Sequence, residues 1–381
     1  MATGTRPLPR TGRVPVGRRF LFVERRRATL TVLGVAASLL LVLLLGGIFA
    51  GAIERVTFYI RTSAAAVFVS QAGVKTMHMS ASALPADTVT RLRSVPGVAW
   101  AAPIGLASGS VAGPRGRQLT YLIGYDTTSG HGGPATLAAG RVPRAGEAVL
   151  DEQAADSLGV HLDDAVTVLG ARLRVVGFST GGSSITNTTV FTTAADFARI
   201  RGGAPPSYVL VGGHRGLAPD VLARRVRAAL PDTTVQTREQ FTASEARIVT
   251  DMSANLLRLM STIGLLIALA VIALGLMTAT LARLRDFAVL KALGARTARL
   301  AATVAVQVLW TVALAVAVAA ALGQLLTWAL PLAAPAVAVR ITAGAVLQLG
   351  AGALAVGLLA ALWPLRRIAT LDAATAFRES R

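Results

Sequence analysis

The stretch RLRDFAVLKALGARTAR, residues 283–299, lies between two long apolar segments of this chain. It is basic at both ends and apolar in the middle. Four of its residues fall on one face of a helix, namely Leu284, Phe287, Ala288 and Lys291. Gly294 follows as a helix stop signal. The pattern predicts a short amphipathic helix at a membrane surface. It leaves two interpretations open, a docking element for a soluble partner or a basic turn that anchors two membrane helices.

The composition is that of an integral membrane protein. Hydrophobic residues make up 53% of the chain and charged residues 15%, and the mean hydropathy is +0.60. A membrane-crossing helix needs about 20 apolar residues. Four segments meet this requirement, at residues 28–53, 256–282, 300–330 and 341–365. The first is too long for a secretory signal peptide and lacks its cleavage pattern, so we expect it to remain as a membrane helix.

The distribution of charge predicts the orientation of these four helices. Residues 1–27 hold eight Arg and one Glu, and residues 283–299 hold five basic residues and one Asp. The tail 366–381 holds four Arg and two acidic residues. Positive segments of this kind face the cytoplasm, and all three alternate correctly with four spans. The long segment 54–252 and the short loop 331–340 are then expected outside a bacterial cytoplasmic membrane.

The formal net charge of +19 is mainly a consequence of this topology. The three cytoplasmic segments together contribute +13, whereas segment 54–252 contributes only +4. Anionic lipid headgroups are therefore the expected partner of the basic residues, and a nucleic-acid partner is not expected. The chain has no cysteine, which excludes disulfides and thiol chemistry.

Segment 54–252 has the pattern of a separate α+β domain inserted between the first and second membrane helices. Alternating apolar residues predict strands at residues 65–70, 118–124, 165–169, 172–178 and 207–212. Amphipathic patterns predict helices at residues 86–95, 151–158 and 219–230. Strands and helices mixed without βαβ alternation favour the α+β class. Residues 54–61 and 245–258 continue the patterns of the adjoining spans, so we expect helical, stalk-like ends to this domain.

The sequence lacks the motifs of an enzyme. ATP hydrolysis needs a phosphate-binding loop of the form G-x-x-x-x-G-K-[ST], and neither of the two lysines, Lys75 and Lys291, follows a glycine. No nucleophile elbow or zinc-protease motif is present. The paired carboxylates at residues 151–152 and 163–164 are expected to be turn and helix-cap residues. The near absence of ionisable residues in the spans also argues against an ion-coupled transporter.

One short motif could bind a ligand. Met77, His78 and Met79 combine side chains that ligate haem iron or copper. In a strand, however, His78 would point away from the two methionines, because neighbouring residues face opposite sides. We expect no metal site and no cofactor in this chain.

Residues 283–299 resemble the segment that follows the second membrane helix in FtsX-like, MacB-type ABC transporter permeases. The matching features are an acidic residue, an apolar pair, a basic residue and a small-Leu-Gly-Ala run, which here are Asp286, Val289-Leu290, Lys291 and residues 292–295. The tail PLRRIATLDAATAFRES, residues 364–380, is similar to that family's carboxyl terminus, with Ala373 where proline is usual. Residues 95–103 and 158–178 resemble its outer domain, and the form of 283–299 most resembles the DevC-type and haem-exporting subgroup.

The resemblance implies a homodimeric permease that binds two copies of a separate cytoplasmic ATPase, which would hold ATP and Mg²⁺. In such permeases the helix at 283–296 docks on the ATPase, and its motion is transmitted to the outer domain without a wide channel. The residues expected to make this coupling are Arg285, Asp286, Phe287, Leu290, Lys291, Leu293 and Gly294. The expected substrate is a hydrophobic or amphipathic molecule for export, which the sequence does not name. The alternative is a regulator, similar to FtsX itself, that acts on an outer partner such as a cell-wall hydrolase.

Overall fold

A computed structural model describes residues 25–78, 80–182, 187–282, 297–333 and 337–370, together with Val289. The chain divides into two compact units. The helical unit comprises Met1–Gly47, Leu256–Thr327 and Ile341–Arg381, and the sheet domain comprises Ile48–Asn255 and Trp328–Arg340.

Four long helices contain all the candidate membrane spans of the described residues. They are α2 (Arg25–Thr62), α7 (Arg238–Ala282), α9 (Thr297–Ala333) and α10 (Ala343–Thr370). The apolar stretches that could cross a bilayer are Ala28–Thr62, Arg258–Thr278, Ala298–Leu330 and Ala343–Leu362. The predicted fold class, four membrane helices with an α+β domain between the first and second, is confirmed.

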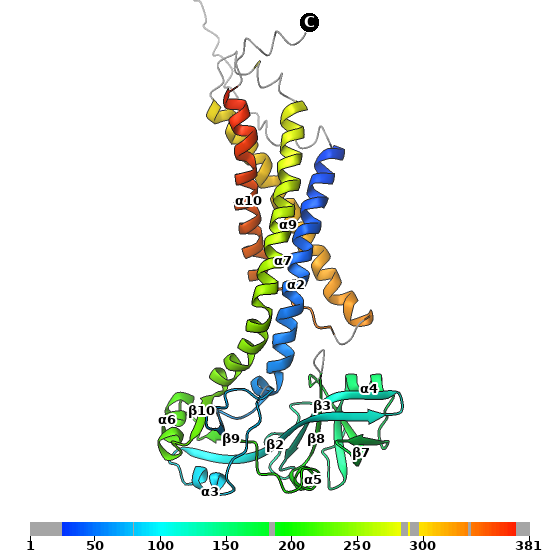
Figure 1. The fold of residues 1–381 in the computed structure, drawn as a ribbon, viewed down its shortest axis with the longest axis vertical. Helices are drawn as coiled ribbons and strands as arrows, with labels where there is room; N and C mark the ends of the chain where they lie inside the picture. The colour runs from blue at the N-terminus through cyan, green and yellow to red at the C-terminus, as the bar shows by residue number, and fades with distance from the viewer. Residues whose placement is uncertain are drawn as a thin grey trace, which may run out of the picture. The chain divides into compact units, whose positions relative to one another are not determined.

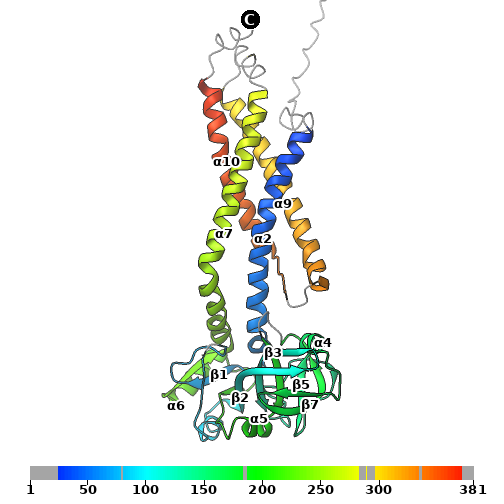
Figure 2. The same cartoon turned by 45° about the vertical axis from the view of Figure 1, so that its right-hand side comes forward.

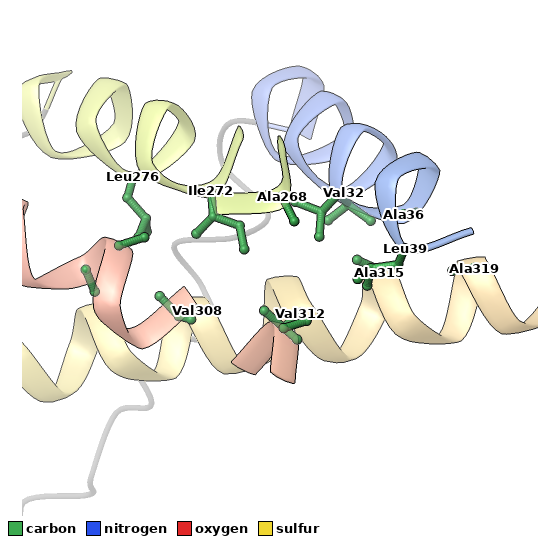
Figure 3. Close-up of a cluster of buried hydrophobic side chains, with 14 of the residues drawn as sticks. Val32, Ala36, Leu39, Ala268, Ile272, Leu276, Val308, Val312, Ala315 and Ala319 are labelled. Atoms are coloured by element: carbon green, nitrogen blue, oxygen red, sulfur yellow. The ribbon is translucent and has the colours of Figure 1, made fainter. Parts of the chain in front are cut away.

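The helices of the helical unit pack through small and branched apolar side chains. Figure 3 shows the buried cluster, to which all four helices contribute. The labelled residues are Val32, Ala36 and Leu39 (α2), Ala268, Ile272 and Leu276 (α7), and Val308, Val312, Ala315 and Ala319 (α9), and α10 adds Ala353, Ala360 and Ala361. Gly357 of α10 lies against Val308, where a β-carbon would come within 2.8 Å of a methyl group. Small residues allow this close approach, which supplies the van der Waals contact that holds helices together in lipid.

The sheet domain is built on one ten-stranded sheet. Its strands are β1 (Val67–Gln71), β2 (Val98–Gly113), β3 (Gly116–Tyr125), β4 (Leu137–Gly140), β5 (Glu147–Asp151), β6 (Ala165–Val168), β7 (Ala171–Ser179), β8 (Thr188–Thr193), β9 (Tyr208–Gly213) and β10 (Thr233–Thr237). The order is β10-β1-β9-β2-β3-β8-β5-β7-β4, and β6 pairs with β2 and β7. Among the strand pairs that the structure describes, β3–β8 and β5–β7 are parallel and the others are antiparallel.

The long strand β2 joins two halves of this sheet. Its residues 98–104 pair with β9, and its residues 105–113 pair with β3. Helices α3 (Thr88–Arg93) and α6 (Pro219–Ala229) cover the first part, which we call the β9 half, and α4 (Glu152–Leu158) and α5 (Ala194–Ile200) cover the second, the β3 half. Figure 1 shows α3 and α6 at one end of the sheet and α4 at the other. Each half has its own buried apolar cluster.

All the predicted strands and helices of this domain are present, with ends shifted by a few residues. The sequence patterns did not predict β2, β4, β5, β8, β10 or α5. The carboxylates at 151–152 and 163–164 do lie at turns and caps: Asp151 accepts from Gln153 N–H at the start of α4, and Asp164 accepts from His161 N–H.

Candidate functional site

The predicted coupling residues lie outside the described part of the chain. This holds for Arg285, Asp286, Phe287, Leu290, Lys291, Leu293 and Gly294. Val289 is described, and it is helical and exposed. Helix α7 ends at Ala282, one residue before this segment, so the opposite end of α7 is where the structure defines a site.

The carboxyl end of α2 and the amino end of α7 are connected through two neighbouring strands. Strand β1 follows α2, β10 precedes α7, and the two strands pair antiparallel with Val67 opposite Thr237. Figure 2 shows β1 beside the ends of both helices. Arg238, the first residue of α7, donates its N–H to the Ala66 carbonyl and its guanidinium to the Ser63 carbonyl, both at 3.0 Å.

A capping box fixes the start of α7. The Thr237 hydroxyl accepts from Gln240 N–H at 3.2 Å, and the Gln240 side chain accepts from Thr237 N–H at 3.1 Å. This reciprocal arrangement satisfies two donors that a helix start leaves unpaired. The motif Thr-x-x-Gln at 237–240 was a sequence signal for this boundary, which the sequence analysis instead placed at residue 245.

One apolar cluster holds both helix ends to the sheet. Phe241 of α7 stacks on Phe68 of β1 with ring centroids 4.9 Å apart, and Ile60 of α2 lies in the same cluster. Both Phe241 and Ile60 are almost fully buried. Burying a side chain of this size contributes about 1.5–3 kcal/mol, so neither helix end can slide without a substantial cost.

We call the contacts of residues 237–245, at the start of α7, the joint. Glu245 is its most unusual residue. It lies on α7 one turn beyond Phe241, and its side chain has 0% exposure. Its carboxylate accepts from Met77 N–H at 2.7 Å and His78 N–H at 3.2 Å, and it lies 2.5 Å from the His78 Nδ1 atom. A buried carboxylate without partners would be strongly destabilising, whereas these donors satisfy it. Glu245 thereby binds α7 to the loop 74–80.

Two tyrosines continue this network into the sheet. The Tyr121 hydroxyl donates to the His78 carbonyl at 3.4 Å, and its ring meets the imidazole edge-on at 4.7 Å. The Tyr208 hydroxyl donates to the Thr76 carbonyl at 2.9 Å. Burial, and then the charge of Glu245, raise the pKa of both tyrosines, so both hydroxyls stay protonated as donors. The loop 74–80 is thus held by α7, β3 and β9.

Two residues of the motif Met77-His78-Met79 take part in the contacts at the start of α7. The described residues of the loop 74–80 form no strand, so the alternation assumed for this motif is wrong. Met77 is buried in the cluster with Phe241, and the His78 ring faces Glu245. Met79 lies outside the described residues. Within the described chain, no group of three or more His, Asp or Glu side chains could hold a metal ion.

Helix α2 makes a separate set of contacts with the sheet domain. Arg55 donates to the Gln153 side chain of α4 at 3.2 Å, and the Tyr59 hydroxyl donates to the Gly132 carbonyl at 2.8 Å. These partners belong to the β3 half and to the loop after β3. The two long helices therefore share the cluster around Phe68, and each also has contacts of its own, α7 with the loop 74–80 and α2 with α4.

The connection between α9 and α10 also contacts α2. The guanidinium of Arg340 lies 2.6 Å from a carboxylate oxygen of Glu54, which is also near Arg61 at 4.0 Å. One turn earlier, a β-carbon on Gly51 would overlap the carbonyl oxygen of Ala338. Glycine at this position is what allows the connection to lie against α2.

Comparison with known proteins identifies the architecture. Residues 28–247 match the family model of the MacB-like periplasmic core domain, and residues 258–373 match that of the FtsX-like permease C-terminal region. An uncharacterized ABC transporter permease of Mycobacterium tuberculosis is 28% identical over 363 residues, covering 93% of this chain and 96% of the relative. Another, from Mycobacterium bovis, is 24% identical over 358 residues with the same coverage.

Solved structures of two outer domains are also similar. The periplasmic region of MacB from Actinobacillus actinomycetemcomitans is 15% identical, with a TM-score of 0.36, and the match covers 49% of this chain and 94% of that one. The extracellular domain of the transporter YknZ from Gram-positive bacteria is 13% identical, also with a TM-score of 0.36, covering 45% of this chain and 97% of that one. The likeness to the DevC-type subgroup stays a prediction.

Proposed function

Because the chain belongs to the MacB- and FtsX-like family of ABC transporter permeases, we propose that it transmits the motion of a cytoplasmic ATPase to its extracellular domain. The chain is a multi-pass membrane protein, and an ABC permease works with an ATPase partner. In this proposal two copies of the permease bind two copies of the ATPase, which holds ATP and Mg²⁺. The work is then done outside the membrane.

The observation that carries this proposal is the continuity of α7. It runs as one helix of 45 residues from the buried joint at Arg238 to Ala282, next to the predicted coupling segment. At 1.5 Å per residue such a helix is roughly 65–70 Å long. A continuous hydrogen-bonded helix is a stiff element, so displacement of one end by the ATPase would move the other end.

The joint determines where this displacement goes. Glu245, Phe241 and the capping box attach α7 to the loop 74–80 and to β1. Arg55 attaches α2 to α4 of the β3 half. The loop 74–80 contacts both halves through Tyr121 of β3 and Tyr208 of β9, whereas Arg55 reaches only the β3 half. A shift of α7 relative to α2 would therefore act unequally on the two halves and change their relative position. This relative movement is the mechanical output that we propose.

Export of a hydrophobic or amphipathic substrate is the activity we assign to this output. Large apolar side chains cover the exposed faces of the spans, for example Leu266, Leu314 and Leu347. Such spans favour mechanical transmission over passage of a polar molecule through the bundle. Untargeted profiling of the molecules retained when the ATPase is inactivated would identify the cargo. An unchanged profile, together with a defect in cell-wall hydrolysis, would favour the regulatory alternative.

The substitution Leu290→Asp tests the coupling step. Leu290 is a predicted contact with the ATPase, and an aspartate there would place an unpaired charge in an apolar interface. We expect the purified complex to lose stimulated ATP hydrolysis while the permease is still expressed and inserted. Leu290→Met, which keeps apolar volume, is the matched control and should retain stimulation. Full stimulation by the aspartate variant would contradict the assignment.

A further inference from the structure

Strand β2 has an unpaired side in the sheet domain. Strand β3 pairs with β2 as far as Gly105, which lies opposite Gly124, and β3 ends one residue later, at Tyr125. No other strand of the described chain pairs with this side of residues 98–103. Residues 98–103 of β2 therefore pair with β9 on one side only. We call the space beside them the open lane. It continues the line of β3.

The register of the sheet shows which backbone groups face the open lane. The Val211 carbonyl accepts from Ala66 N–H, so the backbone groups of Val211 point towards β1. Those of its neighbours Leu210 and Gly212 therefore point towards β2. The backbone groups of their partners, Ala102 and Trp100, consequently point towards β9. Backbone groups alternate along a strand, so those of Ala101 and Pro103 point into the open lane. Ala99 lies in a β-bulge between Val98 and Trp100, where the alternation is interrupted. Pro103, which has no N–H, suits a strand edge of this kind.

The open lane contains a cleft of about 390 Å³. This volume is in the range of sites that bind small molecules or short segments. One wall is β2 from Val98 to Pro103, and the opposite wall contains Asp126, Ser129 and His131. The His131 ring stacks on Trp100 at 3.7 Å with an angle of 6° between the planes. Trp100 in turn lies against Gly212, where a β-carbon would overlap its ring.

The cleft is lined by one positive and one negative side chain, Arg93 and Asp126. Arg93 reaches the Ala101 carbonyl only at 3.4 Å, and its side chain is exposed. Asp126 lies on the opposite wall. Its carboxylate accepts a hydrogen bond from Thr128 N–H at 3.0 Å, which lowers the pKa of Asp126. An anion beside Arg93 would gain a charge-assisted hydrogen bond, whereas an anion beside Asp126 would be repelled.

We propose that the open lane binds an extended, acidic peptide segment of another protein by adding it as a strand to β2. A peptide backbone offers an acceptor and a donor at the spacing of the Ala101 N–H and the Pro103 carbonyl. An acidic residue of the segment would pair with Arg93. An apolar side chain would lie beside the stacked rings of Trp100 and His131. The inference is independent of the transport function.

The test uses the full-length protein in lipid nanodiscs and a fluorescent peptide, acetyl-Thr-Val-Glu-Val-Thr-Val-amide. We expect saturable binding by fluorescence anisotropy. The same peptide methylated on every amide nitrogen should bind at least about tenfold more weakly, because its backbone cannot donate. Equal binding of the methylated peptide, or no saturable binding of either peptide, would overturn the proposal.

Two variants and their controls locate the binding. Arg93→Glu should weaken binding about tenfold, and Arg91→Glu, two residues away and facing the Ala229 carbonyl, should not. Ala101→Pro removes one N–H that faces the lane and should weaken binding similarly. Hydrogen exchange of the unmodified protein guards against misfolding of this variant: peptide should slow exchange at Ala101. Unchanged exchange there, or an effect of Arg91→Glu equal to that of Arg93→Glu, would contradict the site.

Discussion

His78 and Glu245 are 167 positions apart in the sequence, yet the histidine Nδ1 atom lies 2.5 Å from a carboxylate oxygen of the glutamate. Glu245 is fully buried on α7, and His78 retains 23% exposure in the loop 74–80. The two backbone N–H groups of Met77 and His78 complete the set of donors. This contact fastens the helix that leaves the membrane to a loop that rests on two strands of the sheet.

Glu245→Ala should destabilise the sheet domain. The substitution leaves two backbone donors and an imidazole without their acceptor, at a cost of about 3 kcal/mol. For a domain of this size the expected fall in Tm is about 6–12 °C, measured on the full chain by differential scanning fluorimetry. Glu239→Ala, at an exposed position of the same helix, should change Tm very little. Equal effects of the two substitutions would show that the buried carboxylate contributes nothing special.

Gly51→Ala should separate the α9–α10 connection from α2. Its β-carbon would overlap the Ala338 carbonyl, and the nearby pair of Glu54 and Arg340 would be displaced. Overpacking of this kind costs about 1–3 kcal/mol. Gly46→Ala is the matched control on the same helix, because a β-carbon there meets nothing within 4 Å. We expect a lower Tm for the first variant only. A neutral Gly51→Ala would mean that the connection does not depend on this contact.

Glu147 should give the sheet domain part of its resistance to acid. Arg141 donates two hydrogen bonds to its carboxylate at 2.6 and 2.7 Å, Arg144 N–H and Arg174 add one each, and the pKa of Glu147 falls to about 2. A carboxylate whose pKa is lower in the folded state stabilises the fold above its unfolded pKa. This contribution is lost as the pH falls towards 2.

The substitution Glu147→Gln measures that contribution. The difference in Tm between the wild-type protein and this variant should be largest at neutral pH and should shrink as the pH falls from about 5 to 2. Glu152→Gln, at an exposed position of α4, serves as the control and should show no such trend. A difference that is constant over this pH range would contradict the role of the ionised carboxylate.

The membrane helices and the alternating strands could be predicted because their signals are local. Length and apolarity identified the four spans, and period-two alternation identified β7 and β9. Strand β2 was missed because it contains Pro103 and three glycines, which usually interrupt strands. The fold explains one of them: Gly105 and its partner Gly124 lie against the ring of Phe197, which leaves no room for a side chain.

The buried contact of Glu245 with the loop 74–80 could not be predicted from the sequence. Glu245 carries no motif, and its partners come from a loop that lies far away in the chain. A single acid on a helix is usually exposed, so nothing marked this one as buried. His78 was noticed for the wrong reason, as a candidate ligand in a strand. Tertiary contacts of this kind follow from the packing of α7 against β1, which no local pattern encodes.

The most direct test of mechanical transmission breaks α7 between its two ends. The chain has no cysteine, so Arg172→Cys in β7 and Arg224→Cys in α6 can carry spin labels without background. In the complex with the ATPase, the distance between these labels should change on addition of ATP, as the two halves of the sheet shift. Inserting three glycines after Asp251, before the candidate span begins at Arg258, should abolish this change while ATP hydrolysis continues. A distance change of full amplitude in the glycine variant would contradict the account.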